Sequence, residues 1–134
     1  MIAVDSSVLI DVLTNDATNA EASMLKMQDA MERGGVVVCE SALAEVASQV
    51  EPEDELLDAL AEMGVHYSAL NEQAAARAGF MHRRYRSRGG TRQRVVADFL
   101  VGAHALLQCD GLITRDAAFF RDYFKGLKII NPAA

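Results

Sequence analysis

The feature that most constrains the fold is a repeated alternation between short apolar segments and longer segments with helical periodicity. Segments such as "MIAV" and "VVVC" contain no charged residue, which is typical of strands buried on both faces. Strands that alternate with helices favour a parallel sheet covered by helices on both sides. We therefore predict an α/β fold, a three-layer α/β/α sandwich with a mostly parallel sheet of about five strands. The predicted strands cover residues 1–4, 36–39, 65–70, 112–114 and 127–130.

The intervals between these strands contain signals that begin and end helices. Ser6 or Ser7 can cap a helix through "VLIDVL", and Ser41 begins another helix that Pro52 stops. Glycine pairs at 34–35 and 89–90 end two further helices. The other predicted helices cover 19–33, 53–63, 71–87, 94–108 and 117–123, and the helix that begins at Ser41 runs to residue 50.

Composition indicates one folded domain, which we expect to span residues 1–134. The chain has 134 residues, of which 51% are hydrophobic and 24% charged, so it can bury a core and is too apolar to be disordered. Its start lacks the basic region of a signal peptide, and the longest apolar stretch, "FLVGAHALL", is too short to cross a bilayer. We therefore expect a cytoplasmic protein with no membrane partner. Cys39 and Cys109 lack the paired spacing of a zinc site and are expected to be reduced apolar side chains.

Four acidic residues are predicted to meet at one edge of the sheet. Asp5 follows the first strand, Asp116 follows the fourth, and Glu45 lies early in the helix after the second. Asp98 interrupts an apolar helical pattern, where a carboxylate needs a partner such as Arg94 or a role at the helix end. Ligands of open α/β sheets bind beyond the carboxyl ends of the strands. Asp5 and Asp116 alone could be ordinary strand-end acids, and Glu45 alone could be a solvated helix residue. Four acids together, however, repel one another unless a cation lies among them, and Mg²⁺ or Mn²⁺ prefers such oxygen ligands.

Four sequence blocks, in order, resemble the motifs of one known family. The blocks "AVDSSVLIDVL", "SALAEV", "VVADFLVGAHAL" and "LITRDAAFF" look like those of PIN-domain ribonucleases, and they are most similar to the VapC-type toxins of prokaryotic toxin–antitoxin pairs. The resemblance extends over nearly the whole chain. It implies a PIN-like fold, a Mg²⁺- or Mn²⁺-dependent endoribonuclease activity on RNA, a homodimer, and a small cognate antitoxin protein that blocks the site.

The resemblance also implies roles for individual residues. The catalytic acids would be Asp5, Glu45, Asp98 and Asp116. Those expected to bind the metal are Asp5, Asp98 and Asp116, and the hydroxyls expected to position them are those of Ser6, Ser7 and Thr114. Some relatives have a further acid shortly after the fourth, whereas Ala117 and Ala118 follow here, so we expect one ion.

The basic residues are concentrated in one segment. The net charge is −6, yet residues 1–72 contain 15 acidic and 2 basic side chains, while residues 73–134 contain 4 acidic and 11 basic ones. Seven arginines lie between 77 and 94, directly before Asp98, where they can bind RNA phosphates or instead form a solvated helix face. The predicted RNA-binding residues are Arg83, Arg84, Arg86, Arg88, Arg92 and Arg94.

Other functions fit the sequence less well. A haloacid-dehalogenase-type phosphatase requires a second aspartate where Ser7 stands, and the phosphate-binding motif of P-loop enzymes is absent. His104 lies in an apolar helical segment and is expected to be packed rather than catalytic. Two alternatives remain open, namely a catalytically silent PIN-like module that binds RNA or protein, and a housekeeping RNA-processing nuclease.

Overall fold

A single parallel sheet organises the computed structural model, which describes residues 1–133. Its strands are β1 (Ile2–Val4), β2 (Val36–Val38), β3 (Val65–Tyr67), β4 (Gly111–Ile113) and β5 (Ile129–Ile130). They are ordered β3-β2-β1-β4-β5, and every neighbouring pair is parallel. In β1, Ile2 lies opposite Val36 on one side and Gly111 on the other. The predicted parallel α/β sheet is confirmed.

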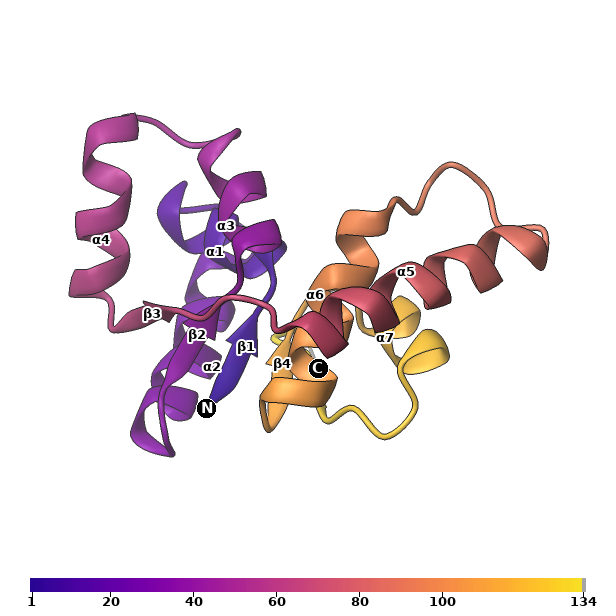
Figure 1. Ribbon diagram of the computed structural model, residues 1–134. Helices are drawn as coiled ribbons and strands as arrows, with labels where there is room; N and C mark the ends of the chain where they lie inside the picture. The colour runs from indigo at the N-terminus through magenta and orange to yellow at the C-terminus, as the bar shows by residue number, and fades with distance from the viewer. Residues whose placement is uncertain (134) are drawn as a thin grey trace.

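Seven α-helices and one 3₁₀ turn connect the strands among residues 1–133. They are α1 (Ser6–Leu13), α2 (Ala20–Glu32), α3 (Glu40–Ala47), η1 (Glu53–Glu55), α4 (Leu56–Glu62), α5 (Glu72–Ser87), α6 (Val96–Gln108) and α7 (Ala117–Tyr123). Crossovers between parallel strands are right-handed, so helices that follow β1 and β2 cover one face, and those that follow β3 and β4 cover the other. Figure 1 shows α1 to α4 on the left and α5 to α7 on the right. The three-layer sandwich is therefore confirmed.

Several element boundaries differ from those predicted. Asp5, rather than Ser6 or Ser7, caps α1, because its backbone is extended and its carboxylate accepts the N–H of Ser6. The hydroxyls of both serines are therefore available for other partners. The predicted helix over 53–63 is divided into η1 and α4, and β3 and β5 are shorter than predicted.

The strand order reverses beside β1. The chain builds the sheet outward from β1 through β2 to β3, and then returns to the opposite side of β1 with β4. A hydrogen bond of 2.9 Å from the N–H of Asp5 to the carbonyl of Ile113 continues the β1–β4 pairing past the end of β1. Such a switch point creates a crevice at the carboxyl ends of the strands, the usual ligand site of this architecture.

An aromatic cluster fixes α6 beside this crevice. Phe99 is fully buried, and its ring centre lies 5.3–6.1 Å from those of Tyr85, Phe119, Tyr123 and Phe124. The cluster joins α5, α6 and α7 into one layer. Because Phe99 lies in the first turn of α6, this packing also determines where that turn meets the strand ends.

Within residues 1–133, no helix combines the length and the apolar character that crossing a membrane requires.

Candidate active site

Asp5 lies directly after β1, and three donors bind its carboxylate. Oδ1 accepts the N–H of Ser6 at 2.8 Å, and Oδ2 accepts the hydroxyls of Thr114 at 2.7 Å and Ser7 at 3.3 Å. Burial is the main cause that raises the pKa of Asp5 to about 6, and repulsion from Glu45 adds to the rise while the donors oppose it. The carboxylate is thus held in one orientation but is costly to ionise.

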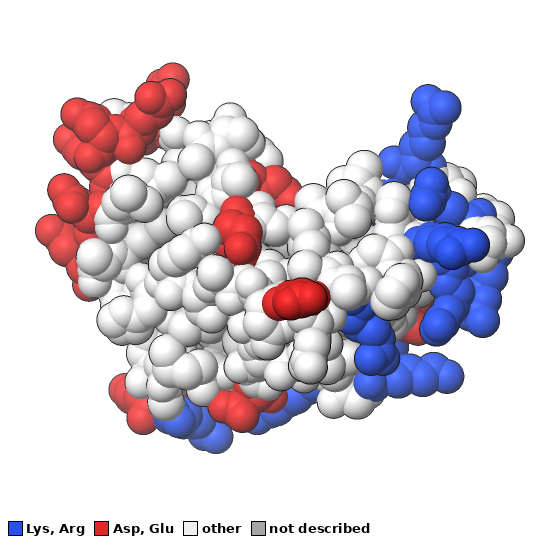
Figure 2. Space-filling view, viewed as in Figure 1, with Lys and Arg blue, Asp and Glu red and all other residues white. Residues whose placement is uncertain are grey.

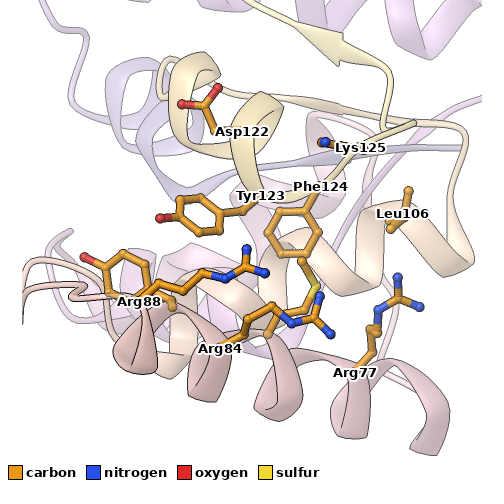
Figure 3. A pocket seen from close by; sticks show the side chains of 10 residues that line it. Arg77, Arg84, Arg88, Leu106, Asp122, Tyr123, Phe124 and Lys125 are labelled. Carbon is orange, nitrogen blue, oxygen red and sulfur yellow. The ribbon is translucent and has the colours of Figure 1, made fainter.

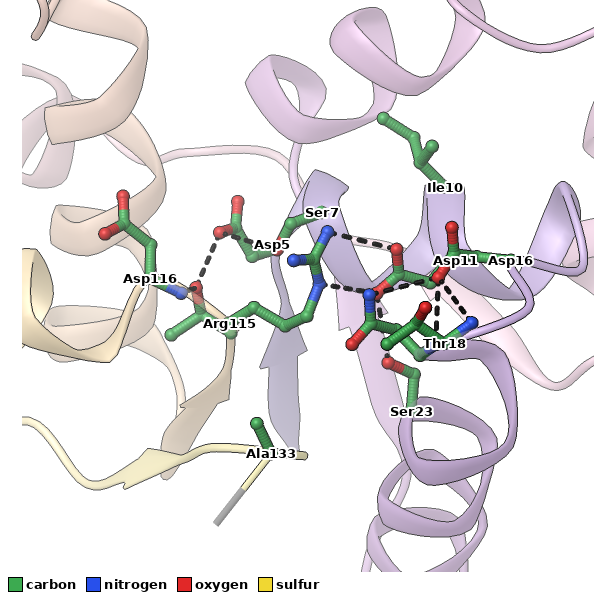
Figure 4. A network of polar contacts seen from close by, with 12 residues as sticks. Asp5, Ser7, Ile10, Asp11, Asp16, Thr18, Ser23, Arg115, Asp116 and Ala133 are labelled. Atoms are coloured by element: carbon green, nitrogen blue, oxygen red, sulfur yellow. Dashed lines mark hydrogen bonds and ion pairs between the residues drawn. The ribbon is translucent and has the colours of Figure 1, made fainter.

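Thr114 connects the two acids that follow neighbouring strands. Its side chain is fully buried, and its Oγ1 donates to Asp5 and accepts the N–H of Asp116 at 2.9 Å. Its own N–H donates to the carbonyl of Ile130, so β5 fixes its backbone. Figure 4 shows the carboxylates of Asp5 and Asp116 on the same side, beyond the ends of β1 and β4.

Glu45 reaches the same edge from α3. The hydroxyl of Ser6 donates to Oε2 of Glu45 at 2.8 Å, which joins α3 to the start of α1. The hydroxyl of Ser41 donates to the carbonyl of Ala97 at 3.2 Å, which joins α3 to the start of α6. These two contacts hold Glu45 between the first turns of α1 and α6.

Asp98 is the third residue of α6, and its Oδ2 accepts the N–H of Val95 at 3.0 Å. It is therefore the helix-end acid that the sequence left as one explanation. Burial raises its pKa, the N–H of Val95 and the charge of Arg94 oppose the rise, and the charges of Glu45 and Asp116 add to it. These interactions place Asp98 within electrostatic range of two other acids of the set.

Asp116 is partly exposed, and an arginine binds it. Both of its oxygens accept from Arg94, with Nη2 3.1 Å from Oδ1 and Nη1 bound to Oδ2. The guanidinium carbon of Arg94 lies 4.1 Å from the ring centre of Phe119, where a cation–π contact holds it. Of the arginines predicted to bind RNA, Arg94 is the one engaged with the acids.

The four carboxylates interact through charge, and Ser6 binds both Asp5 and Glu45, but the four do not close around one point. Among residues 1–133, no group of three or more His, Cys, Asp or Glu side chains is arranged so that it could hold a metal ion. The chemistry of the donor set still fits Mg²⁺ or Mn²⁺, because all donors are carboxylate oxygens that repel one another. An ion that bound through Asp116 would compete with Arg94, which already binds both of its oxygens.

One polar network beside the site was missed from the sequence. Arg115 lies between two site residues in sequence, yet its side chain extends away from them to Asp11 of α1 (Figure 4). Its Nε lies 2.6 Å from Oδ2 of Asp11 and its Nη2 3.1 Å from Oδ1, and Ser23 of α2 donates to the same carboxylate at 3.3 Å. Asp11 is buried and interrupts the apolar run "VLIDVL", which is the same signal that identified Asp98.

The arginine segment and the acidic half lie at opposite ends of the molecule. Figure 2 shows acidic side chains over η1 and α4 at one end, basic ones over α5 and the following loop at the other, and a hollow between them. Arg83, Arg84, Arg86, Arg88 and Arg92 are all exposed. The charge division of the sequence thus becomes a division in space.

His104 is packed, as predicted. It is 1% exposed, its Nε2 lies 3.0 Å from the hydroxyl of Ser68, and burial lowers its pKa. Cys39 is buried, Cys109 is half-buried, and both are free thiols.

The structure is a parallel α/β/α sandwich with carboxylates at its switch point, and comparison with known families identifies the family. The family model described as "PIN domain" matches residues 2–125. The chain belongs to the PIN-domain family, as its ordered motifs predicted. A comparison with curated proteins gave no match.

Three solved structures illustrate the likeness in fold. VapBC2 from Rickettsia felis, bound to a DNA fragment from the promoter, has a TM-score of 0.75 at 14% identity, with 98% of each chain covered. VapBC-1 from nontypeable Haemophilus influenzae has a TM-score of 0.73 at 19% identity over the whole of both chains. A toxin–antitoxin complex from Klebsiella pneumoniae has a TM-score of 0.66 at 19% identity, with 98% of each chain covered.

Proposed function

We propose that this protein is a divalent-metal-dependent endoribonuclease and the toxin of a VapBC-type toxin–antitoxin pair. The observation that carries the proposal is the bridge from Asp5 through the buried hydroxyl of Thr114 to Asp116, with Glu45 and Asp98 coupled to the same two strand ends. Four carboxylates near the same strand ends repel one another and so destabilise the fold. A bound cation would offset this repulsion, which gives a physical reason for their proximity. PIN-domain nucleases generally use divalent metals.

The residues that would hold Mg²⁺ or Mn²⁺ are Asp5, Asp98 and Asp116. A bound ion of this kind supplies charge that stabilises the phosphoryl transition state and makes a water nucleophilic near neutral pH. Asp5 is oriented by its three donors, which leave one lone pair of Oδ1 free for a ligand. Glu45, which accepts the hydroxyl of Ser6, would orient a water or accept its proton. The hydroxyls of Ser7 and Thr114 position Asp5 and touch no substrate in this proposal.

The proposed partners are an RNA substrate, a small antitoxin protein and a second copy of the chain, in the cytoplasm. Support for the antitoxin comes from the folds of the similar proteins, which were solved as VapBC or toxin–antitoxin complexes. Co-expression with the product of a small neighbouring reading frame should give a stable complex and restore growth. Light scattering of the isolated chain should give twice the mass of one chain.

The alternative is a PIN-like module that binds RNA or protein without cutting it. One observation favours it, namely that Asp116, an expected metal ligand, is bound to Arg94. The two functions make opposite predictions after treatment with EDTA. A nuclease regains RNA cleavage when Mg²⁺ or Mn²⁺ is added, and loses it on Asp98→Asn. A binding module retains its affinity in EDTA and cuts nothing with either ion.

A further inference from the structure

A basic groove lies between α5 and the C-terminal end of α7, away from the four acids. Its volume is about 390 Å³. Figure 3 shows the side chains of Arg77, Arg84 and Arg88 along one wall, with Tyr123 and Lys125 on the opposite one. Since α7 begins immediately after Asp116, the groove and the candidate active site lie at the two ends of the same short helix.

The cations of this groove form no ion pair among residues 1–133. Arg77 and Arg84 are seven residues apart and share one face of α5, and Arg88, the C-cap of that helix, follows Arg84 by four residues. Among the ion pairs of residues 1–133, none involves these three arginines or Lys125. Asp122 is the one acid that lines the groove. Four cations facing one acid in a concave site concentrate positive potential there.

The groove is also lined by aromatic side chains. Tyr85 and Tyr123 contact each other edge to face, with ring centres 5.4 Å apart. Tyr85 is buried, and its hydroxyl accepts the N–H of Thr91 at 3.0 Å, which fastens the loop after α5. Gly90 is required there, because a Cβ atom at this position would lie 2.4 Å from the Tyr85 ring. This packing thus fixes the position of the helix end that carries the guanidinium groups.

We propose that this groove binds the phosphate backbone of the RNA strand a few nucleotides away from the bond at the acidic site. This inference rests on the proposed nuclease function. Guanidinium forks bind phosphate oxygens in pairs, and single-stranded RNA binds surfaces that combine cations with aromatic rings. A helix of seven residues is about 10 Å long. That length corresponds to about three nucleotides of a stacked strand at about 3.4 Å each.

An acidic peptide would also be attracted to four cations. RNA is favoured because the groove combines the cations with the partly exposed ring of Tyr123 and because the same helix leads from it to the acids.

The arginines near the end of α5 lie on different faces of the helix. Arg84 and Arg88 line the groove, whereas Arg83 and Arg86, which are also exposed, do not. The sequence could not rank these residues, and the structure provides a matched pair of variants.

The test is RNA binding without cleavage. A fluorescein-labelled, unstructured RNA of about 15 nucleotides is titrated with full-length protein in EDTA and followed by fluorescence anisotropy. The variants are R84Q/R88Q and the control R83Q/R86Q, which removes the same charge from the same helix. Circular dichroism checks that both fold, and R77Q serves as a second groove variant.

We expect R84Q/R88Q to bind about tenfold more weakly and to lower the slope of log affinity against log salt by about 1.4, at about 0.7 per phosphate contact. The control should weaken binding about threefold or less, by long-range charge alone. Equal losses in both pairs would overturn the groove, because total charge would then explain binding. A second outcome would also overturn the proposal. If the same variants lose affinity for a labelled poly-glutamate peptide while their RNA affinity is unchanged, the groove binds an acidic protein partner instead.

The groove and the nuclease can fail separately. If the groove variants lose RNA binding but the wild type cuts nothing with Mg²⁺ or Mn²⁺, the groove is supported and the nuclease is not. If cleavage depends on Asp98 while groove and control variants bind RNA alike, the nuclease is supported and the groove is overturned.

Discussion

Arg94 binds Asp116 by both carboxylate oxygens, with its Nη2 3.1 Å from Oδ1, and its guanidinium lies over the ring of Phe119. Its charge also opposes the rise in the pKa of Asp98. Arg94 therefore neutralises two of the carboxylates that we expect to bind a metal. A cation that enters the site has to compete with a cation that the chain already provides.

Replacement of Arg94 by Gln should strengthen metal binding. Without the guanidinium, Asp116 is free and the repulsion among the acids increases, so Mn²⁺ affinity measured by calorimetry should rise several-fold. Stability without metal should fall by about 1 kcal/mol or less, because the pair is partly exposed. R92Q removes the same charge from the same loop and should leave Mn²⁺ affinity nearly unchanged. A weaker affinity in R94Q would show that Arg94 supports the ion instead of competing with it.

Asp98 allows its catalytic and structural roles to be separated. Its carboxylate accepts the N–H of Val95 at the start of α6, and the amide oxygen of Asn can accept the same bond. D98N should therefore reduce metal-dependent RNA cleavage at least about 100-fold with little change in unfolding free energy. D98A should lose the same activity and about 1 kcal/mol of stability as well. If D98N retains wild-type cleavage, Asp98 is not a metal ligand.

Thr114 should act through its hydroxyl alone. Val has nearly the same shape, but T114V leaves the N–H of Asp116 without its partner and Oδ2 of Asp5 with the Ser7 hydroxyl alone, at a cost of about 1–3 kcal/mol. T114S restores the hydroxyl and should recover most of the lost stability and Mn²⁺ affinity. Urea denaturation and calorimetry on both variants measure the effect. Equal losses in T114S and T114V would mean that packing of the methyl group, and not the bridge, is what matters.

The fold followed from the sequence because its signals are local. Uninterrupted apolar segments and glycine pairs are enough to predict a parallel sheet, and the ends of strands β1 and β4 position Asp5 and Asp116 wherever the helices lie. Helix starts were less predictable, since Asp5, Ser6 and Ser7 are all good caps and the choice depends on which side chains have partners elsewhere. The hydrogen bond from Ser6 to Glu45 joins residues that are far apart in the sequence, and no local pattern predicts it.

The arginines show the same limit. Seven of them in one segment predicted a basic surface, and the structure has one, but their individual partners depend on tertiary packing. Arg94 binds Asp116, Arg84 lines a groove, and Arg83 faces elsewhere. Arg115 was not recognised at all, because its partner Asp11 is 104 residues away in sequence. Its role is structural and can be tested as such.

Replacement of Arg115 by Met should destabilise the fold strongly. It leaves the buried carboxylate of Asp11 without its cation, which typically costs about 3 kcal/mol or more in a buried pair. The partial exposure of Arg115 reduces the expected loss to about 2–3 kcal/mol. The double variant D11L/R115M removes both charges and should recover most of the stability in urea denaturation. A double variant as unstable as R115M would indicate that the pair is needed for its geometry rather than for neutralisation.

The raised pKa of Asp5 predicts a pH dependence of stability. Its pKa is about 6 in the folded protein and near 3.8 when unfolded, so the folded chain binds the proton more tightly. Asp5 therefore destabilises the fold progressively as pH rises from about 4 to about 6 and above. D5N has no such titration. The unfolding free energy of D5N minus that of the wild type should increase by about 1–2 kcal/mol between about pH 4 and about pH 7.5, an amount reduced for partial exposure.

Saturating Mn²⁺ at the higher pH should stabilise the wild type and not D5N, because the ion would bind the ionised carboxylate. A difference between the two proteins that stays constant with pH would contradict the burial of a titrating Asp5, and equal stabilisation of both by Mn²⁺ would remove Asp5 from the metal ligands.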